Sequence, residues 1–263
     1  MQNCYKSLTR YRFEKVRQRA KLKHSLARLV NILFPELEGA VSTLHLNCIY
    51  SMLLNYPSAK DIAKFGFDIF ANLIESSSNG RFDKSKAKEI RNPARKSVGV
   101  YTYAKAMELR QTIKLIQILE PEIEEIEEQI HTHVQDSPIT TIPCITFRMA
   151  AMIQAEIDDF NRFSSPEKIL AFAGLPPTTY QSDNFISSKA KMDKRGSRYL
   201  RYALFISAQY VSLWVLLSKT ITKRNVPKAS IILLLYLTLP KNFFALSATS
   251  TKLGNLFKIF LDS

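Results

Sequence analysis

The stretch IKLIQILEPEIEEIEEQI, residues 113–130, repeats isoleucine and leucine at alternating steps of three and four residues. This spacing places the apolar side chains on one face of a helix. The seam residues are Ile116, Leu119, Ile123, Ile126 and Ile130. Pro121 is expected to kink or restart the helix, because proline removes a backbone donor and clashes with the preceding turn. The stretch therefore predicts a mainly α fold with a helical, coiled-coil-like region and a short heptad seam.

Glutamates surround this seam without histidine partners. They are Glu120, Glu122, Glu124, Glu125, Glu127 and Glu128. A metal site of carboxylates and imidazoles would need its ligands to converge, whereas these residues are spread around a helix. The pattern favours a solvated acidic face. His131 and His133 follow directly, and a pair near a helix end is more typical of a surface than of a metal site.

The first thirty residues form a basic arm that contains nine Lys or Arg and the single acid Glu14. Apolar residues recur in it at helical spacing until Pro35, so the arm is predicted to be one amphipathic helix. Two interpretations stay open at this point. The cations form either a solvated helix face or a surface that contacts nucleic acid, because a face of one sign repels itself unless a polyanion lies along it.

The composition points to a polyanion partner. The chain has 263 residues, and its 37 Lys and Arg against 23 Asp and Glu give a formal net charge of +14. The three cysteines Cys4, Cys48 and Cys144 lie far apart without a ligand spacing, so the sequence suggests neither a disulfide framework nor a zinc site. The longest apolar run, IILLLYLTL at 231–239, is too short to span a membrane. These features indicate a cytoplasmic protein with no membrane partner.

Further along the chain, turn and helix signals alternate. Ser58 is a predicted helix N-cap, and Gly174 is a predicted C-terminal stop. The stretch AGLPPTTYQSDNFISSKAKMDKRGSRYLRYALF, residues 173–205, then sets Ser182 before a run of cations. Ser197 is expected to cap a helix that buries Leu200, Ala203, Leu204 and Ala208. Taken alone, Ser182 has the composition of an ordinary loop serine.

Five motifs stand in order across about residues 139–210: IPCIT, EIDDFNRF, AGLPP, QSD and KRGSRYLRYAL. Together they resemble the C-terminal domain of serine-using insertion-sequence transposases, which are guided by a bridge RNA and carry a RuvC-like carboxylate domain at the N-terminus. LTRYR at 8–12 and FPEL at 34–37 also resemble the helical connecting region of that family. The resemblance implies a small helical transposase domain with a helix-hairpin-helix-like turn.

The resemblance makes Ser182 the counterpart of the serine that attacks a DNA phosphate and holds the broken strand covalently. It also implies that a cluster of cations beside Ser182 binds the nucleic-acid backbone. The cluster consists of Lys189, Lys191, Lys194, Arg195, Arg198 and Arg201. Clustered cations can stabilise charge on a reacting phosphate. The implied partners are DNA and a structured guide RNA, with self-association through the helical region.

Several departures from the family pattern bear on activity. Cys144 and Thr146 replace glycines of a turn whose backbone amides approach phosphate, and Asp183 places a carboxylate next to Ser182. Met1 stands where the connecting helices of the family begin, so the carboxylate domain is expected to be absent. This chain is accordingly expected to bind no cofactor or metal of its own, with Mg²⁺ bound only when that domain is present.

These features predict three segments. Residues 1–135 form a helical connecting region, residues 136–215 form a serine transposase-like domain, and residues 216–263 form an atypical basic tail. Two explanations of the tail stay open, a reading frame shifted from an ancestral transposase gene or a divergent amphipathic end. The predicted function is DNA transposition or recombination by a truncated or degenerate transposase, nucleoid-associated in the cytoplasm. The alternative is a noncatalytic nucleic-acid-binding protein derived from a transposase.

Overall fold

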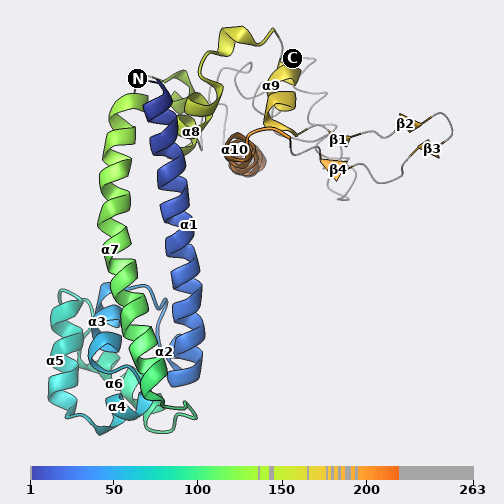
Figure 1. The fold of residues 1–263 in the computed structure, drawn as a ribbon. Coiled ribbons are helices and arrows are strands. Elements are labelled where there is room, and N and C mark those ends of the chain that lie inside the picture. Colours follow the sequence, from blue (N-terminus) through green and yellow to red (C-terminus); the bar gives the residue numbers. More distant parts are fainter. Residues whose placement is uncertain are drawn as a thin grey trace. The chain divides into compact units, whose positions relative to one another are not determined.

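A computed structural model describes residues 2–135, 137–141, 145–164, 166–175 and 195–218, together with four two-residue strands between 177 and 192 (Figure 1). The chain divides into two compact units. The central unit consists of residues 12–125, and the split unit combines residues up to 11 with those from 126 onward. The described residues are mainly helical, as predicted from the sequence. Residues 219–263 of the predicted tail lie outside the described residues.

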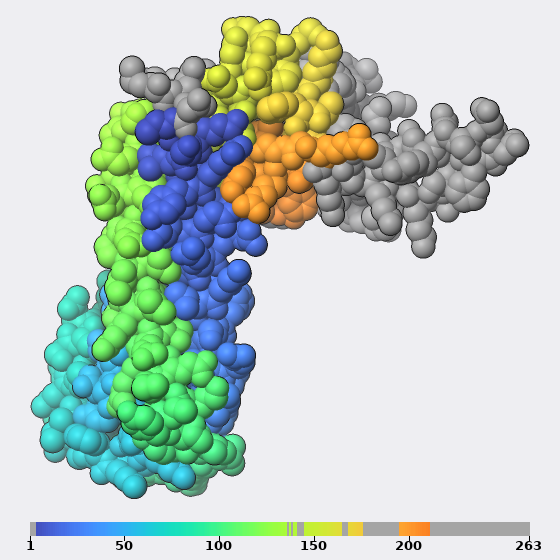
Figure 2. Space-filling model, viewed as in Figure 1, coloured from blue at the N-terminus to red at the C-terminus, as the bar shows by residue number. Residues whose placement is uncertain are grey.

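Two long helices supply the frame of the central unit. Helix α1 (Gln2–Leu33) and helix α7 (Tyr103–Val134) run antiparallel there, since Lys15 pairs with Glu122 and Arg28 pairs with Glu108. Figure 2 shows the two helices in contact. The seam is buried along its length: Ile116 is fully buried and Leu119 and Ile123 are at most 8% exposed. The seam therefore packs as the spacing predicted.

Helix α7 does not restart at Pro121, which lies inside it. The prediction of a restart is therefore wrong, and the alternative, a kink at Pro121, stays a prediction. Proline costs a helix one backbone hydrogen bond and introduces a steric clash. Here Leu119 and Ile123 are buried on either side of the proline, while Pro121 itself is exposed. We infer that burial of the seam compensates for the cost of the proline.

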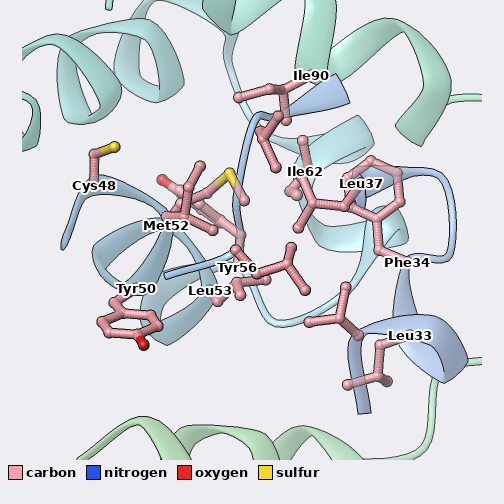
Figure 3. Packing of buried hydrophobic residues seen from close by; sticks show 14 of the residues in the cluster. Leu33, Phe34, Leu37, Cys48, Tyr50, Met52, Leu53, Tyr56, Ile62 and Ile90 are labelled. Carbon is pink, nitrogen blue, oxygen red and sulfur yellow. The ribbon is translucent and has the colours of Figure 1, made fainter. Parts of the chain in front are cut away.

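Five shorter helices complete the central unit. They are α2 (Leu37–Ala40), α3 (Asn47–Asn55), α4 (Ala59–Lys64), α5 (Phe67–Ser77) and α6 (Lys84–Ala94). Their apolar faces form one core with the C-terminal half of α1 and the start of α7. Figure 3 shows Phe34, Tyr50 and Met52 among the residues of this core, and all three are fully buried. The area these side chains remove from water stabilises the unit.

Local signals fix where these short helices begin and end. Ser58 caps α4 as predicted, because its hydroxyl accepts from the Asp61 amide and the Asp61 carboxylate accepts from the Ser58 amide. After α5, Asn79 and Gly80 adopt positive φ angles of 53° and 75°. Both residue types tolerate this conformation, which turns the chain toward α6.

The split unit is built from short helices and one longer C-terminal helix. Its elements after α7 are η1 (Pro138–Thr141), α8 (Phe147–Ile157), η2 (Phe160–Arg162), α9 (Pro166–Ala173), the four strands and α10 (Arg198–Ser218). Helices α8 and α10 pack together through small and branched residues. Ala150 and Ile157 on α8 are fully buried, as are Leu200 and Ala203 on α10. The buried stripe predicted for the last helix is therefore confirmed.

Residues from the two ends of the split unit meet through aromatic contacts. The ring of Tyr5 stacks on His133 with 5.3 Å between ring centroids. His131 meets the edge of Phe147 at 5.1 Å. Both histidines are exposed, as predicted, and each also packs against an aromatic ring. The predicted helix-hairpin-helix-like turn includes residues 142–144, and Cys144 is one of them. These three residues lie outside the described residues.

Candidate functional site

The motifs AGLPP and KRGS meet at a contact between two glycines. Gly174 ends α9 with a φ of 68°, and Gly196 stands just before α10. A Cβ atom on Gly196 would lie 2.1 Å from the Phe172 carbonyl oxygen and 2.4 Å from the Ala173 carbonyl carbon. A Cβ on Gly174 would lie 2.6 Å from the Gly196 nitrogen. Both positions therefore require glycine, because two backbones touch there.

Arg201 fastens the same contact from the side. Its Nη1 atom donates to the Ala173 carbonyl at 2.8 Å, and Arg201 is half-buried. Ala173 is the last residue of α9, whose final carbonyls have no partner within the helix. A cation there also complements the negative end of the helix dipole. The structure thus gives Arg201, a predicted nucleic-acid contact, a role within the fold.

The chain between these glycines leaves the helices and returns as paired strands. Strand β1 (Pro177–Thr178) pairs antiparallel with β4 (Lys191–Met192). Strand β2 (Gln181–Ser182) pairs antiparallel with β3 (Phe185–Ile186), which places Ser182 opposite Phe185. The sequence did not predict these strands. We name the segment between these glycines, residues 175–195, the excursion. It carries Ser182, and the contact between Gly174 and Gly196 holds its two ends together.

The predicted cations fall into two groups. Arg195 and Arg198 are described and exposed, and Arg198 donates to the Tyr199 hydroxyl at 2.7 Å and lies over the Tyr199 ring at 4.7 Å. Lys189 and Lys194 lie outside the described residues, as does Asp183. For Ser182 and Lys191 the structure describes the backbone but not the side chain. Their predicted roles therefore stay predictions.

A buried carboxylate lies behind the start of α10. Glu156, near the end of α8, has a fully buried side chain. Arg10 donates to both of its oxygens, from Nε to Oε1 at 2.6 Å and from Nη2 to Oε2 at 2.9 Å. Lys6 lies 3.5 Å away, and the Ser197 hydroxyl donates to Oε2 at 2.9 Å. Paired hydrogen bonds of this kind are among the strongest in proteins.

This cluster joins three parts of the split unit. Ser197 also caps α10 as predicted, since its hydroxyl accepts from the Leu200 amide at 3.3 Å. Arg10 comes from α1, and its guanidinium lies 4.9 Å from the centre of the Tyr199 ring. Glu156 therefore holds the first residues of α10 and the first turns of α1 against α8.

Sequence reasoning did not single out Glu156 or Arg10. A signal for Glu156 was present, because it stands among buried positions of α8, three residues after Ile153. An acid on an apolar helix face is almost never buried without a partner. No signal in the sequence identified Arg10 as that partner among the nine cations of the basic arm.

The protonation of Glu156 follows from this environment. Burial alone would raise the pKa of Glu156, but the hydrogen bonds from Arg10 and Ser197 and the charge of Lys6 outweigh burial. The pKa of Glu156 is therefore held below the usual glutamate value. A carboxylate with a lowered pKa in the folded state stabilises the fold above its unfolded pKa. That contribution disappears as the pH falls through the folded pKa.

This environment predicts acid sensitivity of the split unit. Below the ordinary glutamate pKa of about 4.3, the wild-type chain should lose the stability that ionised Glu156 contributes. The Glu156→Gln variant should be less stable at neutral pH and should have a flatter stability profile in acid. Thermal unfolding followed by fluorescence of Trp214, the single tryptophan of the chain, on α10, measures both profiles. If the stability profiles of wild type and Glu156→Gln ran parallel in acid, ionised Glu156 would not be the group that stabilises the split unit.

The glutamates of α7 are not simply a solvated face, which corrects that prediction in part. In the central unit Glu122 pairs with Lys15 at 2.7 Å, and Glu120 pairs with Lys23 at 3.4 Å. In the split unit Glu127 accepts from Arg148 at 2.5 Å. The acids of α7 thus neutralise part of the basic arm. This pairing answers the question of how a one-signed helix face is tolerated.

These carboxylates do not fit a magnesium centre. Among the described residues no three His, Cys, Asp or Glu side chains are grouped so that they could hold a metal ion. Among them, Glu156 has the most buried carboxylate, and it is held by Arg10, Lys6 and Ser197 rather than open to a cation.

No helix among the described residues is both long and apolar enough to cross a membrane.

Comparison with known families places the glycine contact in context. Residues 136–221 match the family model described as Transposase IS116/IS110/IS902 family. The matched segment contains Glu156, Gly174, Ser182, Gly196 and Arg201. No curated protein matches the chain. The family match supports an insertion-sequence transposase and, with it, interaction with DNA.

Proposed function

We propose that this chain acts on DNA during transposition of an insertion sequence, with Ser182 as the nucleophile. The observation that supports this proposal most is the contact between Gly174 and Gly196, which holds together the two ends of the excursion that carries Ser182. These residues lie within the segment that matches the family model. Gly174, Gly196 and Arg201 fix the two ends of that excursion against each other. A catalytic group must be held within a fraction of an ångström of its productive position. A segment anchored at both ends suits that requirement.

The proposed chemistry is an exchange of phosphodiester bonds. The Ser182 hydroxyl oxygen attacks the phosphorus and loses its proton. The bond from phosphorus to one deoxyribose oxygen breaks, and that oxygen leaves as a hydroxyl after protonation. The strand is then held as a serine phosphodiester, so the later transfer needs no external energy source. Arg195 and Arg198, exposed at the start of α10, would stabilise the charge on the phosphate together with Lys189, Lys191 and Lys194.

A weak serine nucleophile needs activation. Since the described carboxylates of this chain do not fit a magnesium centre, we assign none of them to that task. In the family that the sequence resembles, a RuvC-like domain supplies carboxylates, and Mg²⁺ held there would polarise the phosphate. A structured guide RNA would choose the target by base pairing, and this chain would contact the backbone. Self-association through the helical region remains part of the proposal.

The nucleophile is tested by trapping a covalent adduct. The full chain is mixed with labelled DNA, Mg²⁺, guide RNA and the carboxylate domain of a close relative, and adducts are separated on a denaturing gel. We expect an adduct in the complete mixture and none with the chain alone. Ser182→Ala should reduce the adduct by several orders of magnitude, as removal of a nucleophile does in other enzymes. Ser188→Ala is the matched control in the same segment and should leave the yield unchanged.

Two results would contradict the proposal. An adduct that persists in Ser182→Ala would assign the attack to another residue. DNA binding without an adduct in any mixture would favour the noncatalytic nucleic-acid-binding protein. Asp183, which follows the proposed nucleophile, is the sequence feature that would explain that second result, because its carboxylate repels phosphate.

A further inference from the structure

Helix α6 of the central unit carries a row of cations along one side. Lys84, Lys88, Arg91 and Arg95 recur at steps of four, three and four residues, with Arg95 at the C-cap. Steps of three and four residues place side chains above one another on a helix. The buried side of the same helix is formed by Ala87, Ile90 and Ala94.

Arg91 ties this row to helix α4. It is half-buried, and its Nη2 atom donates to the Ala63 carbonyl at 3.3 Å and to the Phe65 carbonyl. Its guanidinium also lies 5.6 Å from the centre of the Phe67 ring. Lys64 stands between the two residues whose carbonyls Arg91 binds. We name Lys64, Lys84, Lys88 and Arg95, all exposed, the α6 basic face.

The α6 basic face places like charges next to one another on the helix. The two ends of α6 suit the helix dipole, because Asp83 is the N-cap and Arg91 and Arg95 lie at the C-terminal end. Lys84 and Lys88 are four residues apart, as are Arg91 and Arg95, and like charges at this spacing destabilise a helix. An anion bound along the row would relieve the repulsion within these two pairs.

Apart from the N-cap Asp83, α6 carries no acid in line with this row. No ion pair of the four cations in the α6 basic face occurs among the described residues, whereas Lys15 and Lys23 on α1 pair with glutamates of α7. The acid of α6, Glu89, binds Lys86 at 2.6 Å, and both residues project from the flank away from the row. Glu89 therefore does not neutralise the row.

We propose that the α6 basic face binds the phosphate backbone of duplex DNA. Lys84 and Arg95 are eleven positions apart, which at 1.5 Å per residue is about 16.5 Å along the helix axis. A row of that length can follow several successive phosphates of one strand, and lysine and arginine neutralise them without reading the bases. This DNA contact lies outside residues 136–221, which match the family model. It rests on the proposed function, since that function supplies DNA as the partner.

The test measures duplex DNA binding by the full chain at increasing salt concentration. In the variant Lys84→Gln/Lys88→Gln/Arg95→Gln we expect the slope of log affinity against log salt to become shallower by about 3, because each phosphate contact contributes about 0.9. The matched control is Lys86→Gln/Lys105→Gln/Lys114→Gln, which removes the same charge from the same unit. Lys86 and Lys105 are each paired with a glutamate one turn away. The control slope should stay close to wild type.

A thermal unfolding curve separates binding from folding. Relief of the like-charge pairs should offset the loss of the Arg95 charge at the end of the helix, so the α6 variant should be about as stable as wild type. An unchanged slope, or an equal change in the control, would overturn the proposal, and so would a loss confined to duplex RNA. The Ser182 adduct, assayed at low salt with saturating DNA, should survive in the α6 variant. Loss of that adduct only in Ser182→Ala would therefore support the proposed function without bearing on the α6 basic face.

Discussion

Replacing Gly196 with alanine should cost the split unit about 3 kcal/mol of stability, at the upper end of the range for overpacking. The added Cβ would lie 2.1 Å from the Phe172 carbonyl oxygen and 2.4 Å from the Ala173 carbonyl carbon. Both atoms are backbone atoms of α9, so a rotamer change cannot relieve the clash. The ends of the excursion that carries Ser182 would have to separate. We expect the Ser182 adduct to be lost even where the variant remains folded.

Urea unfolding followed by Trp214 fluorescence measures this change, because Trp214 lies on α10. The matched control is Gly39→Ala in α2, where a Cβ meets nothing within 4 Å. That substitution should leave stability unchanged or raise it by up to about 1 kcal/mol, since alanine favours helix over glycine. Equal stabilities for wild type and Gly196→Ala would show that the Gly196 backbone does not touch the end of α9.

Replacing Arg10 with methionine should have a comparable effect for a different reason. The substitution leaves Glu156 fully buried with Lys6 at 3.5 Å and the Ser197 hydroxyl as its remaining partners. Removing one partner of a buried ion pair typically costs about 3 to 5 kcal/mol. We expect the lower part of that range, because the Arg10 side chain is 40% exposed and Lys6 keeps part of the interaction.

A double-mutant cycle distinguishes this pair from simple packing. The double variant Arg10→Met/Glu156→Met removes the buried charge as well, and it should recover much of the stability lost in Arg10→Met. Arg17→Met is the control, since Arg17 pairs with Glu14 at 3.8 Å on the surface and should change stability by at most about 0.5 kcal/mol. Additive losses in the cycle would mean that Arg10 and Glu156 are not coupled.

Local signals in the sequence predicted several helix boundaries. Ser58 and Ser197 carry a hydroxyl at an N-cap, and Gly174 adopts the positive φ that favours glycine. The seam that includes Ile116 was predicted because its periodicity depends only on residues a few positions apart. Each of these features is decided within one or two helical turns.

The remaining features depend on contacts that no local pattern encodes. Arg10 and Glu156 are 146 residues apart, so neither residue's neighbours identify the other. The register between α1 and α7 decides which acids meet which cations, and a buried seam does not specify it. The strands around Ser182 lack the alternation of apolar and polar residues that would predict them. Arg201 was assigned to nucleic acid because charge alone cannot reveal a bond to the Ala173 carbonyl.

The separation of Arg10 from Glu156 also bears on the order in which the chain folds. The split unit cannot close during synthesis until α8 has been made, long after α1, and closing so long a loop is entropically costly and slow. The central unit, residues 12–125, is nested in sequence between these two residues. Once α1 and α7 have paired within it, the loop that remains to be closed is much shorter. We therefore expect the central unit to fold first and to bring together the two chain segments that form the split unit.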